Sequence, residues 1–300
     1  NELEFQGKGK VSLTSIFDSR TLVIAFEGWN DAAEGATLAA NEIVTQIGGM
    51  VLESIDPEDY YDFQFSRPIV KNVEDGKREL IWPTTELIGA TNEVIEAFPK
   101  MANLFVLTGP EPSRKWRAFA DEIMEFIEDR DIEAVLFLGA MLADVPHSRP
   151  IQVFKSSPYK EVRENHGAEL PQYEGPVGIL SVIAERLQLE NIPFLSFWAA
   201  VPHYVHNTPA PKAALALLQS VEDVVAAGLD SSSLAEQSFE WERGIDEVAE
   251  QDDEMANYIE SLEERRDSMD SEQIDGEALA FEFEKYLQQN KDKPDEGKGF

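Results

Sequence analysis

The sequence predicts an α/β protein, a three-layer α/β/α sandwich followed by a helical C-terminal extension. Three observations favour this class. Strand-length apolar runs bounded by Gly and Pro recur over the first 228 residues, and segments with helical spacing of apolar residues separate them. Several of these runs are continuous rather than alternating, which is typical of a sheet covered on both faces. Beyond residue 230 the pattern becomes helical without strands.

Strands and helices are expected to alternate along the first part of the chain. The apolar runs predict strands at 21–26, 50–55, 80–82, 104–108, 134–139, 151–154 and 193–199. The helical spacing predicts helices at 31–47, 84–98, 114–129, 177–187 and 211–227. Segment 56–78 interrupts the alternation with four aromatic residues among Asp and Pro, namely Tyr60, Tyr61, Phe63 and Phe65. It predicts a long loop or hairpin that crosses the sheet edge, and its aromatic residues serve an interface or fill the core.

The C-terminal part predicts an acidic, amphipathic helical extension. Apolar residues recur there at steps of three and four among Glu and Asp: Leu234, Phe239, Trp241, Ile245, Val248, Met255, Ile259 and Leu262. A second apolar piece follows Gly276. We therefore expect an α/β/α core over residues 1–228, an acidic helical extension over 229–290, and a disordered polar tail over 291–300.

The strongly acidic composition of the chain limits the classes of molecule that it can bind. The chain has 300 residues, of which 43% are hydrophobic, enough for one large or two medium domains with a buried core. Its 25 basic and 58 acidic residues give a formal charge of -33, which repels phosphate backbones and anionic lipid. Neither a nucleic acid nor a membrane is an expected partner. Basic protein surfaces and self-assembly remain open, and so does a simple role of the charge in solubility.

Residue types and motifs that the sequence lacks exclude several kinds of binding and catalytic site. The sequence has no Cys, which excludes disulfides, thiolate metal sites and cysteine nucleophiles. No apolar run approaches the roughly 18 residues of a membrane span, and the first residues lack the features of a secretory signal, so a soluble cytoplasmic protein is expected. Glycine-rich phosphate loops and a nucleophile elbow for a catalytic Ser are missing. The sequence predicts no metal site and no cofactor.

The segment 22–38 is the most informative in the chain. An apolar run passes through a polar turn into a helical pattern, which indicates a buried strand, a tight turn at Gly28, and a helix capped by Asn30 or Asp31. In an α/β domain this junction lies at the carboxyl end of a strand, where the free amides of a helix start face a ligand crevice or a partner.

Further polar segments follow other predicted strands. His147 follows the strand at 134–139, His203 follows that at 193–199, and Glu111 follows that at 104–108. Since the carboxyl ends of parallel strands share one sheet edge, we expect these loops to meet there. Glu174 precedes a predicted helix, whose positive end it would stabilise. The candidate residues of this rim, for a ligand or an interface, are Glu27, Gly28, Trp29, Asn30, Asp31, Glu111, Arg117, Asp144, His147, Arg149, Glu174 and His203.

Five motifs occur in order along the chain: FEGWNDAA at 26–33, TGPEP at 108–112, ADVPHSRP at 143–150, YEGPVG at 173–178 and WAAVPHYV at 198–205. Together they resemble the actinobacterial branch of the proteasome assembly chaperone 2 family. The resemblance implies an α/β/α fold similar in topology to purine nucleoside phosphorylases and related hydrolases, with a helical C-terminal extension. It also implies self-association, with a trimer favoured, and proteasome-related subunits as partners.

Three functions stay open at this point. The leading hypothesis is a non-catalytic, self-associating cytoplasmic assembly or binding factor. The alternative is a small-molecule hydrolase or transferase that acts on an anionic or nucleoside-like substrate at the rim. Its acid–base and orienting groups would be Glu27, Asp31, Glu111, Asp144, His147 and His203, with Arg149 or Arg117 holding the anion. The third is that these motifs only maintain turns and packing while the helical region carries the function. No catalytic residue is assigned.

Overall fold

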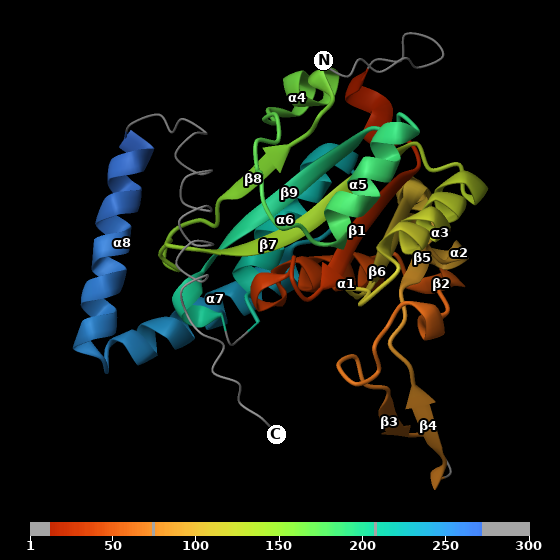
Figure 1. Ribbon diagram of the computed structural model, residues 1–300. Coiled ribbons are helices and arrows are strands. Elements are labelled where there is room, and N and C mark those ends of the chain that lie inside the picture. Colours follow the sequence, from red (N-terminus) through yellow and green to blue (C-terminus); the bar gives the residue numbers. More distant parts are fainter. Residues whose placement is uncertain (1–12, 74–75, 207–208, 272–300) are drawn as a thin grey trace.

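A mixed seven-stranded sheet forms the centre of the computed structural model, which describes residues 13–73, 76–206 and 209–271 (Figure 1). Its strands lie in the order β2-β5-β6-β1-β7-β9-β8. Their bounds are β1 (Thr21–Glu27), β2 (Met50–Ser54), β5 (Glu86–Gly89), β6 (Leu104–Pro110), β7 (Ala134–Ala143), β8 (Val153–Ser156) and β9 (Phe194–Pro202). The four central strands β6, β1, β7 and β9 are parallel, so their carboxyl ends share one edge. β5 is antiparallel to β6, β2 to β5, and β8 to β9.

Helices cover both faces of the sheet, which confirms the predicted three-layer α/β/α class (Figure 1). Helices α1 (Gly35–Gln46) and α6 (Pro211–Val225) pack together on one face, and α3 (Trp116–Asp129) and α5 (Ile179–Leu189) on the other. The α3 stripe of Phe119, Ile123 and Ile127 is buried, with Phe119 5.8 Å from the Phe26 ring of β1. Burial of this stripe against the sheet is what holds the amphipathic helix in place. Short elements connect these layers: α2 (Asn92–Ala97), α4 (Lys160–His166), η1 (Leu13–Asp18), η2 (Ala32–Glu34), η3 (Pro57–Asp59), η5 (Pro99–Asn103) and η6 (His203–Val205).

Two further helices follow the sandwich, as the predicted fold class requires. α7 (Ser232–Ala249) packs on α6, and α8 (Asp253–Ser271) continues from it beside the sandwich (Figure 1). Leu234 and Ile245 of α7 and Ile259 and Leu262 of α8 are buried. The second apolar piece after Gly276 and the predicted tail at 291–300 lie outside the described residues. The division of the chain at residue 228 stays a prediction. None of the helices in the described ranges combines the length and the apolar character that a membrane crossing requires.

One predicted helix is wrong. Segment 84–98 forms strand β5 and then the short helix α2, because Leu87 and Ile88 are buried between β2 and β6 in the sheet. The expected strand at 80–82 is also not part of this sheet. Instead β4 (Arg78–Ile81) pairs with β3 (Ile69–Asn72) in an antiparallel hairpin that projects from the sandwich (Figure 1).

Two of the four aromatic residues of segment 56–78 fill the core, which is one of the two roles predicted for them; the interface role stays a prediction. Tyr60 and Tyr61 are buried in the core, where the Tyr61 hydroxyl bonds Thr85 at 2.7 Å and donates to the carbonyl of Pro110 at 2.9 Å. Phe63 is partly buried against the core, whereas Phe65 is 84% exposed. The segment therefore anchors the hairpin to the sandwich and leaves its outer part uncovered.

Candidate functional site

The turn after β1 meets the loop after β6 at the carboxyl edge of the sheet. β1 and β6 stay in register to their ends, where Glu27 pairs with Pro110, and the amide of Glu111 donates to the carbonyl of Glu27 at 3.2 Å. Gly28 has a φ of +101°, a conformation that strains residues with a Cβ. The carbonyl of Asn30 accepts from the amide of Ala140 at 2.8 Å, so the turn is also tied to β7.

Asp31 is the residue of this turn that caps a helix. Its Oδ1 accepts from the amides of Ala36 at 2.7 Å and Thr37 at 3.2 Å in the first turn of α1, and its Oδ2 accepts from the Thr37 hydroxyl. Burial raises the pKa of Asp31, and these hydrogen bonds act in the opposite direction. Asp31 is buried and its oxygens are occupied within the chain, which is the geometry of a structural cap.

Glu111 lies at the start of a second helix. Its Oε1 accepts from the amide of Ile179, the first residue of α5, at 2.8 Å and lies 3.5 Å from the Nδ2 of Asn30. Burial raises the pKa of Glu111, while hydrogen bonds from the amides of Ile179 and Trp29 lower it. The carboxylate at the positive end of α5 is thus Glu111, and the exposed Glu174 lies five positions before that helix begins.

Trp29 and Glu27 are the outward-facing members of this group. The side chain of Trp29 is 61% exposed, and that of Glu27 is exposed as well. Partial burial and the nearby Glu34 raise the pKa of Glu27. We name Glu27–Asp31, Glu111 and Gly178–Ile179 the turn cluster. Its inner polar groups fix helix starts, and its outer surface presents an indole beside a carboxylate.

A second group lies after β7 and β9, and we name it the clasp: Asp144, His147, Arg149 and His203 with the residues of α7 and α8 that contact them. His147 is 1% exposed. Its Nδ1 lies 2.9 Å from the Tyr204 hydroxyl and its Nε2 lies 3.0 Å from Asp246 of α7. The Tyr204 hydroxyl accepts from the His147 amide at 2.8 Å, so we infer that it donates its own proton to Nδ1 of the imidazole. The ring proton of His147 is then on Nε2, which donates to Asp246.

Lys212 adds a further link between α6 and α7. Its Nζ donates to the carbonyl of His147 at 2.6 Å and forms an ion pair with Glu242. The Trp241 ring of α7 lies 6.3 Å from the imidazole of His147. The loop after β7 is therefore held by side chains from α6, η6 and α7, and His147 is the residue on which these contacts converge.

Helix α8 closes the clasp on its outer side. The guanidinium of Arg149 donates through Nε and Nη2 to the two carboxylate oxygens of Asp267, each at 2.8 Å, and its Nη1 lies 3.3 Å from Glu263. The hydrogen bond with Arg149 lowers the pKa of Asp267. His203 lies between Asp144, whose Oδ1 is 3.3 Å from its Nδ1, and the ring of Tyr258 at 5.6 Å.

The predicted rim is therefore divided into two groups. The turn cluster and the clasp both lie at the carboxyl edge of the parallel strands, but each group makes its own contacts. Arg117 belongs to neither: it is exposed on α3, as Glu174 is in the loop before α5. Among the residues that the structure describes, no three His, Asp or Glu side chains are placed to hold a metal ion.

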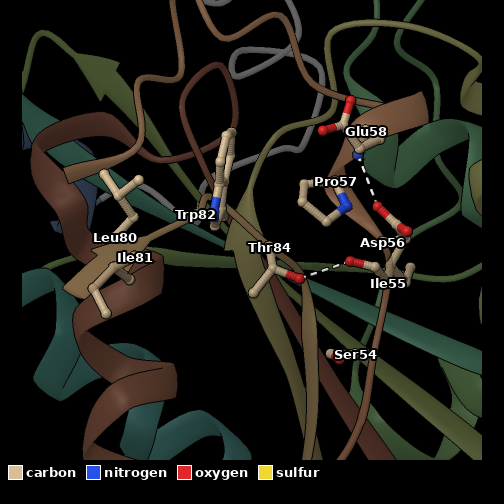
Figure 2. Close-up of a pocket in the computed structure, with 9 residues that line it drawn as sticks. All are labelled: Ser54, Ile55, Asp56, Pro57, Glu58, Leu80, Ile81, Trp82 and Thr84. Carbon is tan, nitrogen blue, oxygen red and sulfur yellow. Dashed lines mark hydrogen bonds between the residues drawn. The ribbon is translucent and has the colours of Figure 1, made fainter. Parts of the chain in front are cut away.

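Sequence reasoning missed a pocket at the base of the β3–β4 hairpin. Its volume is about 580 Å³, and it is lined by Ser54, Ile55, Asp56, Pro57, Glu58, Leu80, Ile81, Trp82 and Thr84. Figure 2 shows Leu80, Ile81 and Trp82 on one side and residues 55–58 on the other, with Thr84 between them. The Thr84 hydroxyl donates to the carbonyl of Ile55 at 2.7 Å, and Trp82 packs on Phe63 with ring centres 4.9 Å apart. The aromatic residues of segment 56–78 were the sequence signal for this region.

Comparison with known proteins identifies similar chains. A family model described as PAC2 family matches residues 25–249. The crystal structure of a PAC2 family protein from Streptomyces avermitilis is 37% identical, with a TM-score of 0.70 over 79% of this chain and 98% of that chain. A proteasome-assembly chaperone homologue from Mycobacterium tuberculosis is also 37% identical, with a TM-score of 0.70 over 80% and 99%. An archaeal proteasome activator from Pyrococcus furiosus shares the fold at 15% identity, with a TM-score of 0.58 over 77% and 93%. No curated protein matches this sequence.

Proposed function

Because this chain belongs to the PAC2 family, we propose that it is a non-catalytic, cytoplasmic assembly factor that self-associates, with a trimer favoured, and binds proteasome-related subunits. Its similarity to a proteasome-assembly chaperone homologue over nearly the whole of that protein supports the choice of partner. The resemblance of its motifs to assembly chaperones supports it as well.

The observation that carries the non-catalytic part is the pairing of the buried polar residues at the rim. Asp31 is held by the amides of α1, Asn30 by the neighbouring backbone and Glu111, and His147 by Tyr204 and Asp246. A general acid or base must reach a substrate atom at hydrogen-bond distance. These groups instead form hydrogen bonds that join loops and helices of the same chain, as structural groups do.

The exposed apolar side chains of the β3–β4 hairpin support the binding part. Monomeric soluble proteins rarely expose contiguous apolar patches of substantial size, and such patches mark interaction sites. Six side chains of this kind lie on or beside the hairpin, each more than a third exposed: Ile69, Val70, Val73, Leu80, Ile81 and Trp82. A surface of this kind fits the handling of other protein subunits better than the turnover of a small molecule.

The test is reconstitution with purified components. The full chain is mixed with purified proteasome α-subunits, and the mixture is separated by size exclusion with light scattering. We expect co-elution of the two proteins, and we expect the chain alone to elute as an oligomer. Two matched variants test whether the hairpin is the binding surface. Val70→Ser/Leu80→Ser on the hairpin should lose co-elution, whereas Leu170→Ser/Leu189→Ser, which changes two exposed apolar residues outside the hairpin and α7, should keep it. A chain that is monomeric at micromolar concentration and does not co-elute with any α-subunit contradicts the proposal.

One observation favours the alternative, a small-molecule hydrolase or transferase. Glu27 and Glu111, both with a raised pKa, lie beside the exposed indole of Trp29, which could stack on a nucleoside-like base. A thermal-shift screen with nucleosides, nucleotides and sugar phosphates distinguishes the two functions. A ligand at a hundred times its dissociation constant adds about 2.7 kcal/mol to the unfolding free energy. A shift that Trp29→Ala abolishes would support the alternative.

A further inference from the structure

The β3–β4 hairpin is built as a two-sided ribbon. We name residues 65–82 the arm. Its strand register places Ile69 opposite Ile81 and Val70 opposite Leu80. Because successive residues of a strand point to opposite faces, one apolar pair lies on each face of the ribbon. All four side chains are exposed, and a two-stranded ribbon alone is marginally stable in water. The arm therefore has the features of an element that another surface covers.

The charge of the arm differs from that of the whole chain. It carries the basic residues Arg67, Lys71, Lys77 and Arg78 and three acidic residues, whereas the whole chain has 25 basic and 58 acidic residues. Lys71 and Arg78 are exposed on the two strands, close to the apolar pairs. A slightly basic, apolar ribbon on a strongly acidic molecule is complementary to the rest of that molecule's own surface.

Helix α7 presents a surface that matches the arm. Its buried side carries Leu234, Ser238, Ile245 and Ala249. The opposite side carries exposed residues at helical spacing: Glu236, Phe239, Glu240, Arg243 and Glu247. Phe239 is 65% exposed among these carboxylates. We name these five residues the outer face of α7. It combines an aromatic side chain with net negative charge, as a partner for exposed aliphatic and basic side chains should.

The arm and α7 lie at different ends of the sheet. The arm connects β2 to β5, the two strands at one edge, whereas α7 packs on α6, which lies against β9 and β8 at the other edge (Figure 1). We infer that the arm of one copy docks on the outer face of α7 of a second copy. This inference rests on the proposed self-association and names its two surfaces. A head-to-tail contact of this kind closes into a ring when the rotation between copies allows it.

Charge exchange tests this assignment. The arm variant Lys71→Glu/Arg78→Glu and the α7 variant Glu236→Lys/Glu247→Lys each place like charges in the contact. We expect the wild-type protein to elute as a trimer in size exclusion with light scattering, and each variant alone to fall to one third of that mass. A single chain that carries all four substitutions should return to the wild-type mass, because each arm then faces an α7 of opposite charge.

Two controls keep the result specific. The variant Arg117→Glu/Lys160→Glu reverses two exposed basic residues away from the arm and should leave the mass unchanged. Far-UV circular dichroism spectra should be similar for all variants, since the reversed side chains are exposed and Glu247 loses only a 3.7 Å surface contact with Arg243.

The outcomes separate the inference from the proposed function. A monomeric wild-type chain overturns self-association and this contact together. A wild-type oligomer that both charge variants retain overturns the contact alone. Dissociation of the two variants without recovery in the chain that carries all four substitutions overturns α7 as the receptor. If the arm variant keeps its oligomeric mass but loses co-elution with proteasome α-subunits, the arm binds that partner and not a second copy.

Discussion

The Nε2 of His147 lies 3.0 Å from the Oδ1 of Asp246, and this hydrogen bond joins the loop after β7 to a helix 99 residues further along the chain. The imidazole is almost fully buried, whereas the carboxylate is largely exposed. The same imidazole bonds the hydroxyl of Tyr204 at 2.9 Å. A histidine that sequence reasoning offered as a ligand or acid–base group therefore connects the sandwich to its C-terminal helices.

Removing this imidazole should destabilise the protein. His147→Ala takes away both side-chain hydrogen bonds, leaves the Tyr204 hydroxyl without its acceptor and opens a cavity beside Trp241. We expect the free energy of unfolding in urea to fall by on the order of 2–4 kcal/mol. Gln237→Ala, at an exposed position on the same helix α7 that is not part of its outer face, should change it by less than about 0.5 kcal/mol. Equal stability of the two variants would show that His147 does not hold the clasp.

A pair of glycine substitutions tests the turn cluster. A Cβ on Gly178 would collide with the side-chain amide of Asn30 and lie 2.8 Å from the Oε1 of Glu111. Gly178→Ala should therefore displace the cap of α5 and lower the unfolding free energy by roughly 1–3 kcal/mol. Gly244 lies within α7 with nothing within 4 Å of an added Cβ, so Gly244→Ala should raise it by about 0.5–1 kcal/mol. Thermal unfolding of both variants should show changes in stability of opposite sign. A Gly178→Ala variant as stable as wild type would contradict the close contact of Gly178 with Asn30 and Glu111.

The raised pKa of Glu111 predicts a pH dependence with a definite sign. Burial makes the ionised form of Glu111 less favourable in the folded state than in the unfolded state, in which its pKa has the ordinary value of 4.5. The folded protein thus binds this proton more readily, and lowering the pH from 7 towards 4.5 should stabilise wild type relative to Glu111→Gln. The measurement is the difference in unfolding free energy between the two proteins at each pH, in which contributions of the other acidic groups cancel. A difference that stays flat or falls over this range would contradict the burial of the carboxylate.

Local pattern predicted the fold where the pattern was unambiguous. Residues 22–26 are continuously apolar and all buried in β1, and the α3 stripe faces the sheet as its spacing indicated. The failure at 84–98 has a physical cause. Leu87, Ile88, Val94 and Ile95 fit the spacing of an amphipathic helix as well as that of a strand followed by a helix. Pairing of Leu87 with Leu107 of β6 decides between them, and that contact is distant in sequence.

The sequence predicted where the loops of the candidate site lie, but not which residues their side chains contact. Parallel strand order was enough to indicate which loops reach the carboxyl edge. The groups that complete each contact come from far along the chain: Glu111 caps a helix that begins 68 residues later, and Arg149 pairs with Asp267, 118 residues away. Glu174 was the expected carboxylate for α5 because it is near that helix in sequence. Tertiary packing placed Glu111 there instead, and no local spacing in the sequence carries that information.

The pairing of Arg149 with Asp267 should control how firmly α8 stays on the clasp. Arg149 is partly exposed and Asp267 is exposed, so salt screens the pair. The pair nevertheless fixes the planar guanidinium through hydrogen bonds to two oxygens. Arg149→Met should speed amide hydrogen exchange in the C-terminal half of α8 at pH 7, while Arg265→Met, which removes a charge from an exposed position on α8 itself, should leave it slow. The lowered pKa of Asp267 also predicts how the pair depends on pH. The contribution of the pair to stability is complete above the ordinary pKa of 3.8 and is lost as the pH falls through the lower pKa of the folded state. Equal exchange in the two variants would show that α8 is held without this pair, and fast exchange in wild type at pH 7 would show that the pair does not hold α8 in place.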